Sequence, residues 1–223
     1  MFTGLKKILK YKMLAVNGEI GKVEDFYFDE RFNTVRYLVV NTGGFLFKNL
    51  VLISPIFIDH VFDDEKLVKV SLTKEEIEES PDVDTEEPIS RLYEKQFYKY
   101  YRTTPYWNGY LSWGTVPVPI GLRSTDLMVL DDEESKEDEE HYLRSVNEVC
   151  GYKCETRDGK IGYIKDFMID LKNWRIETFI MSMKHLSTGD EIEFDMRWIE
   201  RFSYSDKRAY LDIAIKELEN IML

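Results

Sequence analysis

Short runs rich in apolar residues, separated by glycine, asparagine and aspartate, dominate two long parts of this chain. Short apolar runs bounded by such turn-forming residues are typical of β-strands. The clearest runs are residues 34–41, 51–59, 175–182 and 192–200. Several short strands in each part, joined by tight turns and accompanied by little helix, predict small antiparallel β-barrels.

The two parts are diverged copies of one domain. A shift of 141 positions aligns them without a gap, and this alignment pairs Gly18 with Gly159, Gly21 with Gly162, Asp25 with Asp166, and Asp29 with Asp170. Duplication is the simplest explanation. We therefore expect a first barrel over residues 1–80, a partly helical connector over 81–140 and a second barrel over 141–223.

The repeated glycines and aspartates are assigned structural roles. Asn-Gly at 17–18 and Asp-Gly at 158–159 stand between apolar runs and predict type I′ hairpin turns at Gly18 and Gly159. Gly21 and Gly162 then fall inside a strand, which indicates a bulge or a sharp bend. Asp29 and Asp170 are expected to accept backbone hydrogen bonds at the start of the next turn.

The repeated aspartates do not have the spacing of a catalytic pair. Residues four apart on an extended strand, such as Asp25 and Asp29 or Asp166 and Asp170, lie about 13 Å apart. Paired catalytic carboxylates lie roughly 5 to 9.5 Å apart. The sequence also lacks a phosphate-binding glycine loop, a nucleophile elbow and an HExxH motif. We therefore expect no catalytic residues.

Two short helices are predicted in the first copy. Thr73 and Glu76 form a capping-box pattern, and Pro81 ends that helix. The basic segment 1–12 carries apolar residues at helical spacing, so a membrane-surface helix is one interpretation. The same apolar spacing recurs at 143–150 without the lysine cluster. We therefore favour docking of this segment onto the barrel.

Aromatic residues crowd the connector. Ser90 is a suitable N-cap for a helix on which Leu92, Tyr93, Phe97, Tyr100 and Tyr101 recur at helical spacing, and Tyr106 and Trp107 follow it. This helix could pack back on a barrel as core, expose a recognition surface, or pack against the other barrel or a second copy of the chain. We favour the third arrangement, with Tyr100, Tyr101, Tyr106 and Trp107 as partner-binding residues.

Most of the negative charge lies in one segment. Of the formal net charge of −12, residues 131–140 (DDEESKEDEE) carry −7, because eight carboxylates face one lysine. This run has no apolar residue to bury and predicts a solvated, flexible tether, with an acidic interaction segment or a metal-binding run as alternatives. An acidic chain without a basic stripe beside its aromatic residues argues against nucleic-acid binding.

Composition is that of a cytoplasmic globular protein. No apolar run approaches the roughly 20 residues that cross a bilayer, and no signal-peptide pattern opens the sequence. Cys150 and Cys154 are poorly spaced for a disulfide within one strand, and the three histidines are scattered. We expect ordinary buried thiols, no metal site and no cofactor.

The first copy resembles the PRC-barrel family, named for the cytoplasmic domain of the photosynthetic reaction-centre H subunit. The resemblance is carried by NGEIGKVEDFYFDERFNTVRYLVVNTGG followed by VLISPIFI, and in the second copy by DGKIGYIKDFMID. LRSVNEVCGYKCETRDGKIG and SPDVDTEEPISRLYEKQFYKYYRTTPYW are similar to a soluble bacterial branch with two barrels. The second copy departs from the family pattern at STGDEIEFDMRWI, which affects its loop and surface.

The resemblance implies a mainly β protein built of two tandem PRC-type barrels that hold partners together without shared catalytic residues. We therefore expect a non-catalytic interaction or scaffold protein that binds a protein partner or forms a homodimer. Three alternatives stay open. The barrel of a ribosome-maturation factor suggests a role in RNA processing, and the H subunit suggests an electron-transfer assembly role. The third alternative is an enzyme with an unrecognised pocket.

Overall fold

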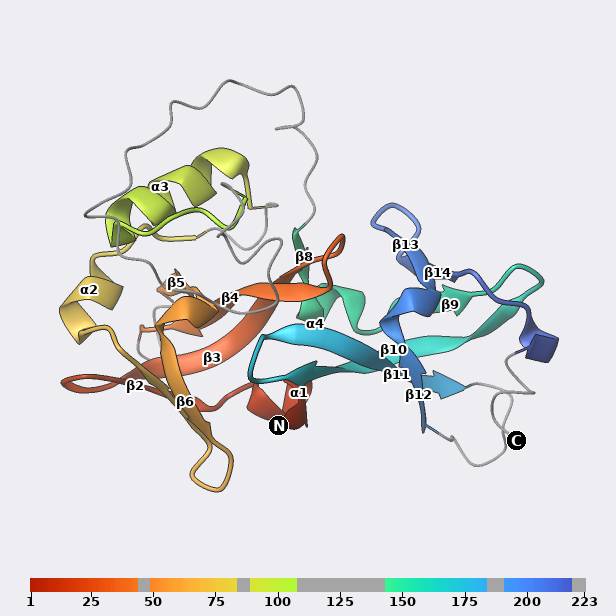
Figure 1. Ribbon diagram of the computed structural model, residues 1–223, viewed down its shortest axis with the longest axis horizontal. Coiled ribbons are helices and arrows are strands. Elements are labelled where there is room, and N and C mark those ends of the chain that lie inside the picture. Colours follow the sequence, from red (N-terminus) through yellow and green to blue (C-terminus); the bar gives the residue numbers. More distant parts are fainter. Residues whose placement is uncertain (44–48, 84–88, 108–142, 184–190, 218–223) are drawn as a thin grey trace.

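The computed structural model describes residues 1–43, 49–83, 89–107, 143–183 and 191–217. It shows a mainly β protein in which two strand-rich units lie side by side and one longer helix lies over the first unit (Figure 1). The acidic segment 131–140 lies outside the described residues, so its role as a tether stays a prediction.

The described residues of the first unit form six strands and two short helical elements. Thr73 caps the last helix through a capping box with Glu76, as predicted. The elements are β2 (Lys12–Ala15), β3 (Gly18–Asp29), β4 (Thr34–Asn41), β5 (Leu50–Ile53), η1 (Pro55–Phe57), β6 (Ile58–Phe62), β7 (Leu67–Val70) and α2 (Lys74–Glu78).

The second unit repeats these elements at a distance of 141 residues. They are β9 (Lys153–Glu155), β10 (Lys160–Asp170), β11 (Arg175–Met183), β12 (Glu191–Asp195), η2 (Met196–Trp198), β13 (Ile199–Ser203) and β14 (Arg208–Leu211). Each unit has the same strand order, β6-β7-β2-β3-β4 in the first and β13-β14-β9-β10-β11 in the second. The gapless sequence repeat therefore corresponds to a repeat of the fold.

The expectation of purely antiparallel units was wrong in one ladder of each. β2 pairs with β7 in parallel, and β9 pairs with β14 in parallel, while the other ladders are antiparallel. A parallel pair needs a long crossover, which the intervening strands of the unit supply. Alternation along a strand does not show the direction of its neighbour, so the sequence pattern could not reveal these pairs.

The predicted type I′ turns were also wrong, although both hairpins form. Ala15 pairs with Gly18, so Val16 and Asn17 occupy the centre of the first hairpin, and Asn17 does not have a positive φ. Gly18 has a φ of 139°, whereas Gly159 has no positive φ. Gly18 therefore needs its conformational freedom after the turn, and the central positions do not require glycine.

Gly21 and Gly162 lie at equivalent places where another backbone approaches closely. A Cβ at Gly21 would lie 2.2 Å from the carbonyl oxygen of Asn41, and a Cβ at Gly162 would lie 2.2 Å from that of Ser182. Both ladders are irregular beside these glycines. Glycine is required here because no side chain fits between the strands.

The units exchange the segments that precede them. β1 (Phe2–Gly4) pairs with β10 of the second unit, and β8 (Leu143–Ser145) pairs with β3 of the first. The short helices α1 (Leu5–Ile8) and α4 (Val146–Val149) follow these strands and contact the same partner strands. Residues 2–8 thus dock onto a β unit, but this unit belongs to the second copy and not to the first.

Equivalent hydrogen bonds fix the two exchanged segments. Asp25 Oδ1 accepts from the backbone N–H of Asn147, and Asp166 Oδ1 accepts from that of Lys6, both at 3.0 Å. The Ser145 hydroxyl adds a further hydrogen bond to Asp25. Burial raises the pKa of both carboxyls, and the hydrogen bonds from the exchanged segments act in the opposite direction. These aspartates hold the units together.

The contact between the units is pseudo-symmetric. Thr34 pairs with Arg175, its own equivalent, and is flanked by two equivalent hydrogen bonds. These run from Val35 N to Trp174 O at 2.9 Å and from Ile176 N to Asn33 O at 2.7 Å. The hydrophobic core is continuous across the contact, where the rings of Phe28 and Phe167 lie 5.5 Å apart. The two units therefore form one packed body.

Candidate protein-binding site on the first unit

The described part of the connector forms one helix, α3 (Arg91–Tyr101), that lies over the first unit (Figure 1). The Ser90 side chain caps its start by accepting a hydrogen bond from the backbone N–H of Tyr93 at 3.2 Å. The helix ends at Tyr101, and the C-cap residue Arg102 adopts a left-handed conformation with a φ of 52°. α3 packs on the first unit, so packing against the second unit, one part of the preferred sequence interpretation, is corrected here. The other part, association with a second copy of the chain, stays a prediction.

The surface beneath α3 is an apolar face of the first sheet. Tyr37, Val39 and Leu52 point to this side of β4 and β5, and Phe57 follows on η1; we call these four residues the outer face. Tyr37 and Phe97 meet edge to face at 5.1 Å, and Phe57 and Tyr101 lie 4.8 Å apart. Such ring pairs stabilise a contact beyond the area that they bury.

A buried carboxylate joins α3 to the outer face. Glu94 is 3% exposed and accepts hydrogen bonds from the Tyr37 hydroxyl at 2.8 Å and from Arg91 Nη1 at 2.9 Å. Burial raises the pKa of Glu94 to about 7, while Arg91 and the Tyr37 hydroxyl act in the opposite direction. The contact between α3 and the outer face therefore contains a carboxyl group that is shielded from water.

A second buried charge lies next to Glu94. Arg36 on β4 is fully buried and pairs with Asp29, also fully buried, with 3.2 Å between Nη2 and Oδ2. The ring of Tyr106 lies over the guanidinium group, 4.1 Å from Cζ to the ring centroid. Burial removes both ions from water, and the attraction between them offsets only part of the free energy that this desolvation costs.

The four predicted partner-binding residues have different environments. Tyr106 is 3% exposed and belongs to the core, so its ring is not open to a partner in this structure. Tyr100, Tyr101 and Trp107 are partly exposed. The hydroxyl of Tyr100 donates to the carbonyl of Glu76 at 2.9 Å, and Trp107 lies over Arg91 at 4.0 Å. Partner binding by these residues stays a prediction.

The turn residues lie away from α3, with one exception. Asp29 Oδ1 accepts from the backbone N–H of Arg31 at 3.0 Å, and Asp170 Oδ1 accepts from that of Lys172 at 3.2 Å. Asp29 also accepts a hydrogen bond from Arg36, so it connects the turn with the buried charges near α3. Gly18, Gly21, Gly159 and Gly162 lie in or beside the hairpins of the two units.

Sequence reasoning missed Glu94 and Arg36. Glu94 precedes Phe97 by three residues and Tyr101 by seven, so it falls on the apolar side of the helix, and this position was the available signal. Arg36 interrupts the apolar run TVRYLVVN, which was a second signal. Charged residues are rarely buried without a partner, and the partners could be recognised only in the folded chain.

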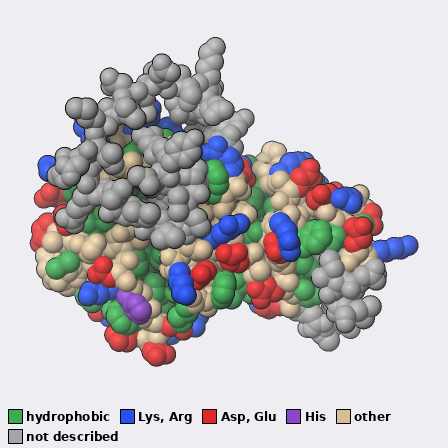
Figure 2. Space-filling model, in the orientation of Figure 1, with side chains coloured by type: hydrophobic (Ala, Val, Ile, Leu, Met, Phe, Trp, Pro, Cys, Tyr) green, Lys and Arg blue, Asp and Glu red, His purple; other side chains and the backbone are tan. Residues whose placement is uncertain are grey.

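The cysteines and the possible metal ligands were the other groups considered for chemistry. Cys150 and Cys154 are free thiols, and burial raises the pKa of each to about 12. Within the residues that the structure describes, His, Cys, Asp and Glu side chains form no group of three suited to a metal ion. No helix in this part of the chain is long and apolar enough to cross a membrane. On the face in Figure 2, acidic and basic side chains are interspersed.

Residues 14–77 match the family model of the PRC-barrel domain. The first unit is a PRC-barrel domain. The match begins in β2 and ends in α2, so it leaves out β1 and α1, which pack on the second unit. No curated protein matches the chain.

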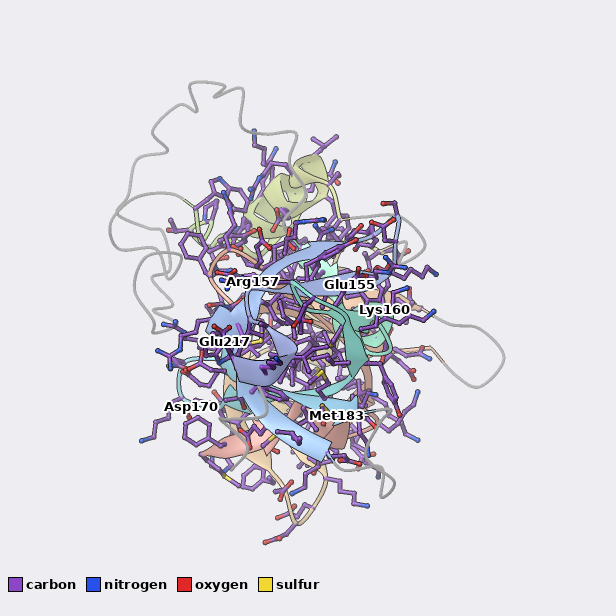
Figure 3. All side chains as sticks on the ribbon, turned by 90° about the vertical axis from the view of Figure 1, so that its right-hand side faces the viewer. Glu155, Arg157, Lys160, Asp170, Met183 and Glu217 are labelled. Atoms are coloured by element: carbon purple, nitrogen blue, oxygen red, sulfur yellow. The ribbon has the colours of Figure 1, made fainter. Side chains whose placement is uncertain are left out.

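The second unit has the strand order of the first unit but a different outer face. Thr178, Ile180, Glu193 and Trp198 stand where Tyr37, Val39, Leu52 and Phe57 stand in the first unit. Glu193 is exposed, whereas Leu52 is fully buried. Glu217, the equivalent of Glu76, lies on the second unit, which faces the viewer in Figure 3. Among the described residues, the apolar surface beneath α3 therefore belongs to the first unit.

Proposed function

We propose that the protein is a non-catalytic interaction or scaffold protein, in which a rigid pair of PRC-type units presents the connector helix and its surroundings to a protein partner. The observation that carries this proposal is the exposure of apolar side chains around α3. Leu92 is 66% exposed on the helix, and Tyr100, Tyr101 and Trp107 are only partly covered by the first unit. Tyrosine, tryptophan and arginine are enriched at protein interfaces.

The roles of four partly or fully buried carboxylates also support binding over chemistry. Asp25 and Asp166 hold the exchanged segments, Asp29 holds Arg36, and Glu94 holds Tyr37. Each of these carboxylates is used to position another part of the chain. The repeat and the exchange fix the separation of the two units, as a scaffold requires. RNA processing, electron-transfer assembly and catalysis stay alternatives predicted from the sequence.

Native purification from the host, followed by identification of the proteins that come with the chain, tests this proposal. We expect a specific partner that is retained by the wild type and lost from a Tyr100→Ala/Trp107→Ala variant. Phe2→Ala is the matched control, because Phe2 is 63% exposed but lies on β1, outside the connector. Sedimentation of the purified chain shows whether the partner is a second copy. Equal recovery from both variants would contradict the proposal.

A further inference from the structure

One side of α3 carries a row of positive charges. Arg91, Lys95 and Lys99 follow one another at intervals of four residues, and Arg102 is the C-cap residue. Residues four apart lie on the same side of a helix. We call these four residues the basic stripe. They form a row only on the folded helix, so the expectation that no basic stripe lies beside the aromatic residues was wrong.

The one acidic residue of α3 lies on another side of the helix. Glu94 is 3% exposed and accepts a hydrogen bond from Tyr37 on the sheet. Lys99 and Arg102, by contrast, are exposed, and Lys95 is half-buried. The outer surface of α3 is therefore positive, although the chain as a whole has a formal net charge of −12.

The basic stripe weakens α3 itself. Like charges four residues apart on a helix repel each other, as Arg91 and Lys95 or Lys95 and Lys99 do. Arg91 also lies in the first turn, where the helix dipole favours negative charge. Its guanidinium group is held by Glu94 and by the ring of Trp107. A bound group of negative charge would offset the repulsion along the stripe.

The acidic helix α2 lies beside a different flank of α3. The hydroxyls of Tyr93 and Tyr100 donate to the carbonyl oxygens of Pro81, which follows α2, and of Glu76 within it. Lys99 is one residue before Tyr100, so its side chain leaves the helix about 100° away from that of Tyr100. The three glutamates of α2 (KEEIE) therefore lie on the tyrosine flank, and the basic stripe faces away from them.

An apolar side chain is exposed within the basic stripe. Leu92 is 66% exposed, and Lys95 and Lys99 follow it at three and seven residues, so the three share one side of α3. A ligand for this surface therefore combines carboxylates with an apolar group. The chain's own segment 131–140 has carboxylates but no apolar residue. A nucleic acid extends beyond the stripe, where the excess of acidic residues in the chain repels it.

We propose that the basic stripe binds an acidic segment of the partner protein, which places carboxylates on Lys95 and Lys99 and an apolar side chain on Leu92. This inference rests on the proposed binding function and specifies the chemistry of the partner. Lys95 and Lys99 lie about 6 Å apart along the helix axis. Carboxylates on alternate residues of an extended segment lie about 6.7 Å apart, so such a segment matches the spacing of the lysines.

A labelled peptide serves as the probe for the partner segment. Its sequence alternates glutamate with serine around one central leucine, and a peptide with glutamine in place of glutamate is its control. Anisotropy titration compares the wild type with the full chain carrying Lys95→Glu and Lys99→Glu. We expect this double variant to bind the acidic peptide at least about tenfold more weakly, because like charges then face each other.

A second double variant controls for net charge. Lys153→Glu with Lys160→Glu changes the charge of the chain by the same amount, and both lysines are exposed on the second unit. We expect it to bind the peptide within about twofold of the wild type, because physiological salt screens charges more than about 8 Å from the ligand. Thermal unfolding checks that each variant folds. If charge reversal lowers the melting temperature, Lys95→Ala with Lys99→Ala removes the charges with a good helix former.

Several results would overturn the proposal. Equal weakening by the two double variants would do so, as would an affinity that does not depend on salt or on the charge of the peptide. Peptide binding only after the acidic residues of 131–140 are changed to their amides would assign the stripe to the chain's own segment. Tighter binding of a short thymidine oligonucleotide than of the peptide would assign it to a nucleic acid. No peptide binding to the wild type or to the amide variant would also contradict it.

This test and the test of the proposed function fail separately. Peptide binding at the stripe, with no partner in native purification, supports the acidic preference and contradicts the binding function in the host. A partner that is retained equally by the wild type and by the Lys95→Glu/Lys99→Glu variant contradicts the acidic segment and leaves the binding function in place.

Discussion

Asp25 Oδ1 accepts a hydrogen bond from the backbone N–H of Asn147 at 3.0 Å, across the contact between the two units. The equivalent hydrogen bond joins Asp166 and Lys6 at the same distance. Each aspartate is thus a clamp on the segment that the other unit supplies.

Replacing Asp25 with alanine tests this clamp. The substitution leaves the N–H of Asn147 without its acceptor, so we expect the free energy of unfolding to fall by about 1–3 kcal/mol. Denaturant titration measures the change, and amide exchange should accelerate in β8 and α4. Asp195→Ala is the control, because Asp195 caps the exposed start of η2 within its own unit. A loss no larger than that of the control would mean that the clamp is not needed.

The close backbone contact at the second repeated glycine predicts a steric effect. Alanine at Gly21 or Gly162 would place Cβ 2.2 Å from a carbonyl oxygen, and we expect a loss of roughly 1–3 kcal/mol or more. Alanine at Gly159 meets only the Ile215 Cδ1 atom at 2.9 Å, which can move. Thermal unfolding should therefore rank Gly159→Ala well above the other two variants. Equal melting temperatures for all three would rule out the steric explanation.

The buried acid under α3 predicts a pH dependence. The folded protein holds the Glu94 proton more tightly than the unfolded chain, because burial raises the pKa from 4.5 to about 7. The contribution of this group to stability is therefore fully present below about pH 4.5 and is lost as the pH rises to about 7, by an amount on the order of 3 kcal/mol.

Glu94→Gln should remove this dependence. The quantity to measure is the difference in unfolding free energy between wild type and variant at pH 4.5 and at pH 8, since other groups titrate equally in both proteins. We expect the wild type to lose stability relative to the variant at the higher pH. A difference that stays constant with pH would show that Glu94 is ionised throughout, held by Arg91.

The exchanged segments predict that the units stay together when the chain is cut. A protease site inserted within residues 131–140 separates the two repeats covalently, but β1, α1, β8 and α4 still pack on the opposite units. The cut protein should elute from a sizing column as one species and separate only in denaturant. Two peaks under native conditions would mean that each unit is stable without the segment of the other.

The sequence repeat predicted the elements of the fold but could not predict the exchange. Leu5 and Ile8, like Val146 and Val149, are fully buried and show an apolar helix side in the sequence. That pattern predicts that these residues pack against an apolar surface, but it does not indicate which unit provides the surface. The choice depends on chain geometry and on the clamps at Asp25 and Asp166, whose partners are 122 and 160 residues away.

The candidate site was predicted in outline. Helical spacing of Phe97 and Tyr101 indicated an apolar helix side, and the structure provides its partner rings, Tyr37 and Phe57. The burial of Tyr106 could not be foreseen, because it depends on Arg36, a charged residue that enters the core only with Asp29 beside it. Pairings between residues far apart in sequence carry no local signal.

The central claim, that a protein partner binds around the connector helix, is tested most directly by site-specific photo-cross-linking in host cells. A photoreactive amino acid is placed at Leu92 on α3 or, as the matched control, at Val16 in the first hairpin; these side chains are 66% and 65% exposed. We predict a discrete protein adduct from position 92 and only background from position 16. The same adducts, or none, from both positions would contradict the claim.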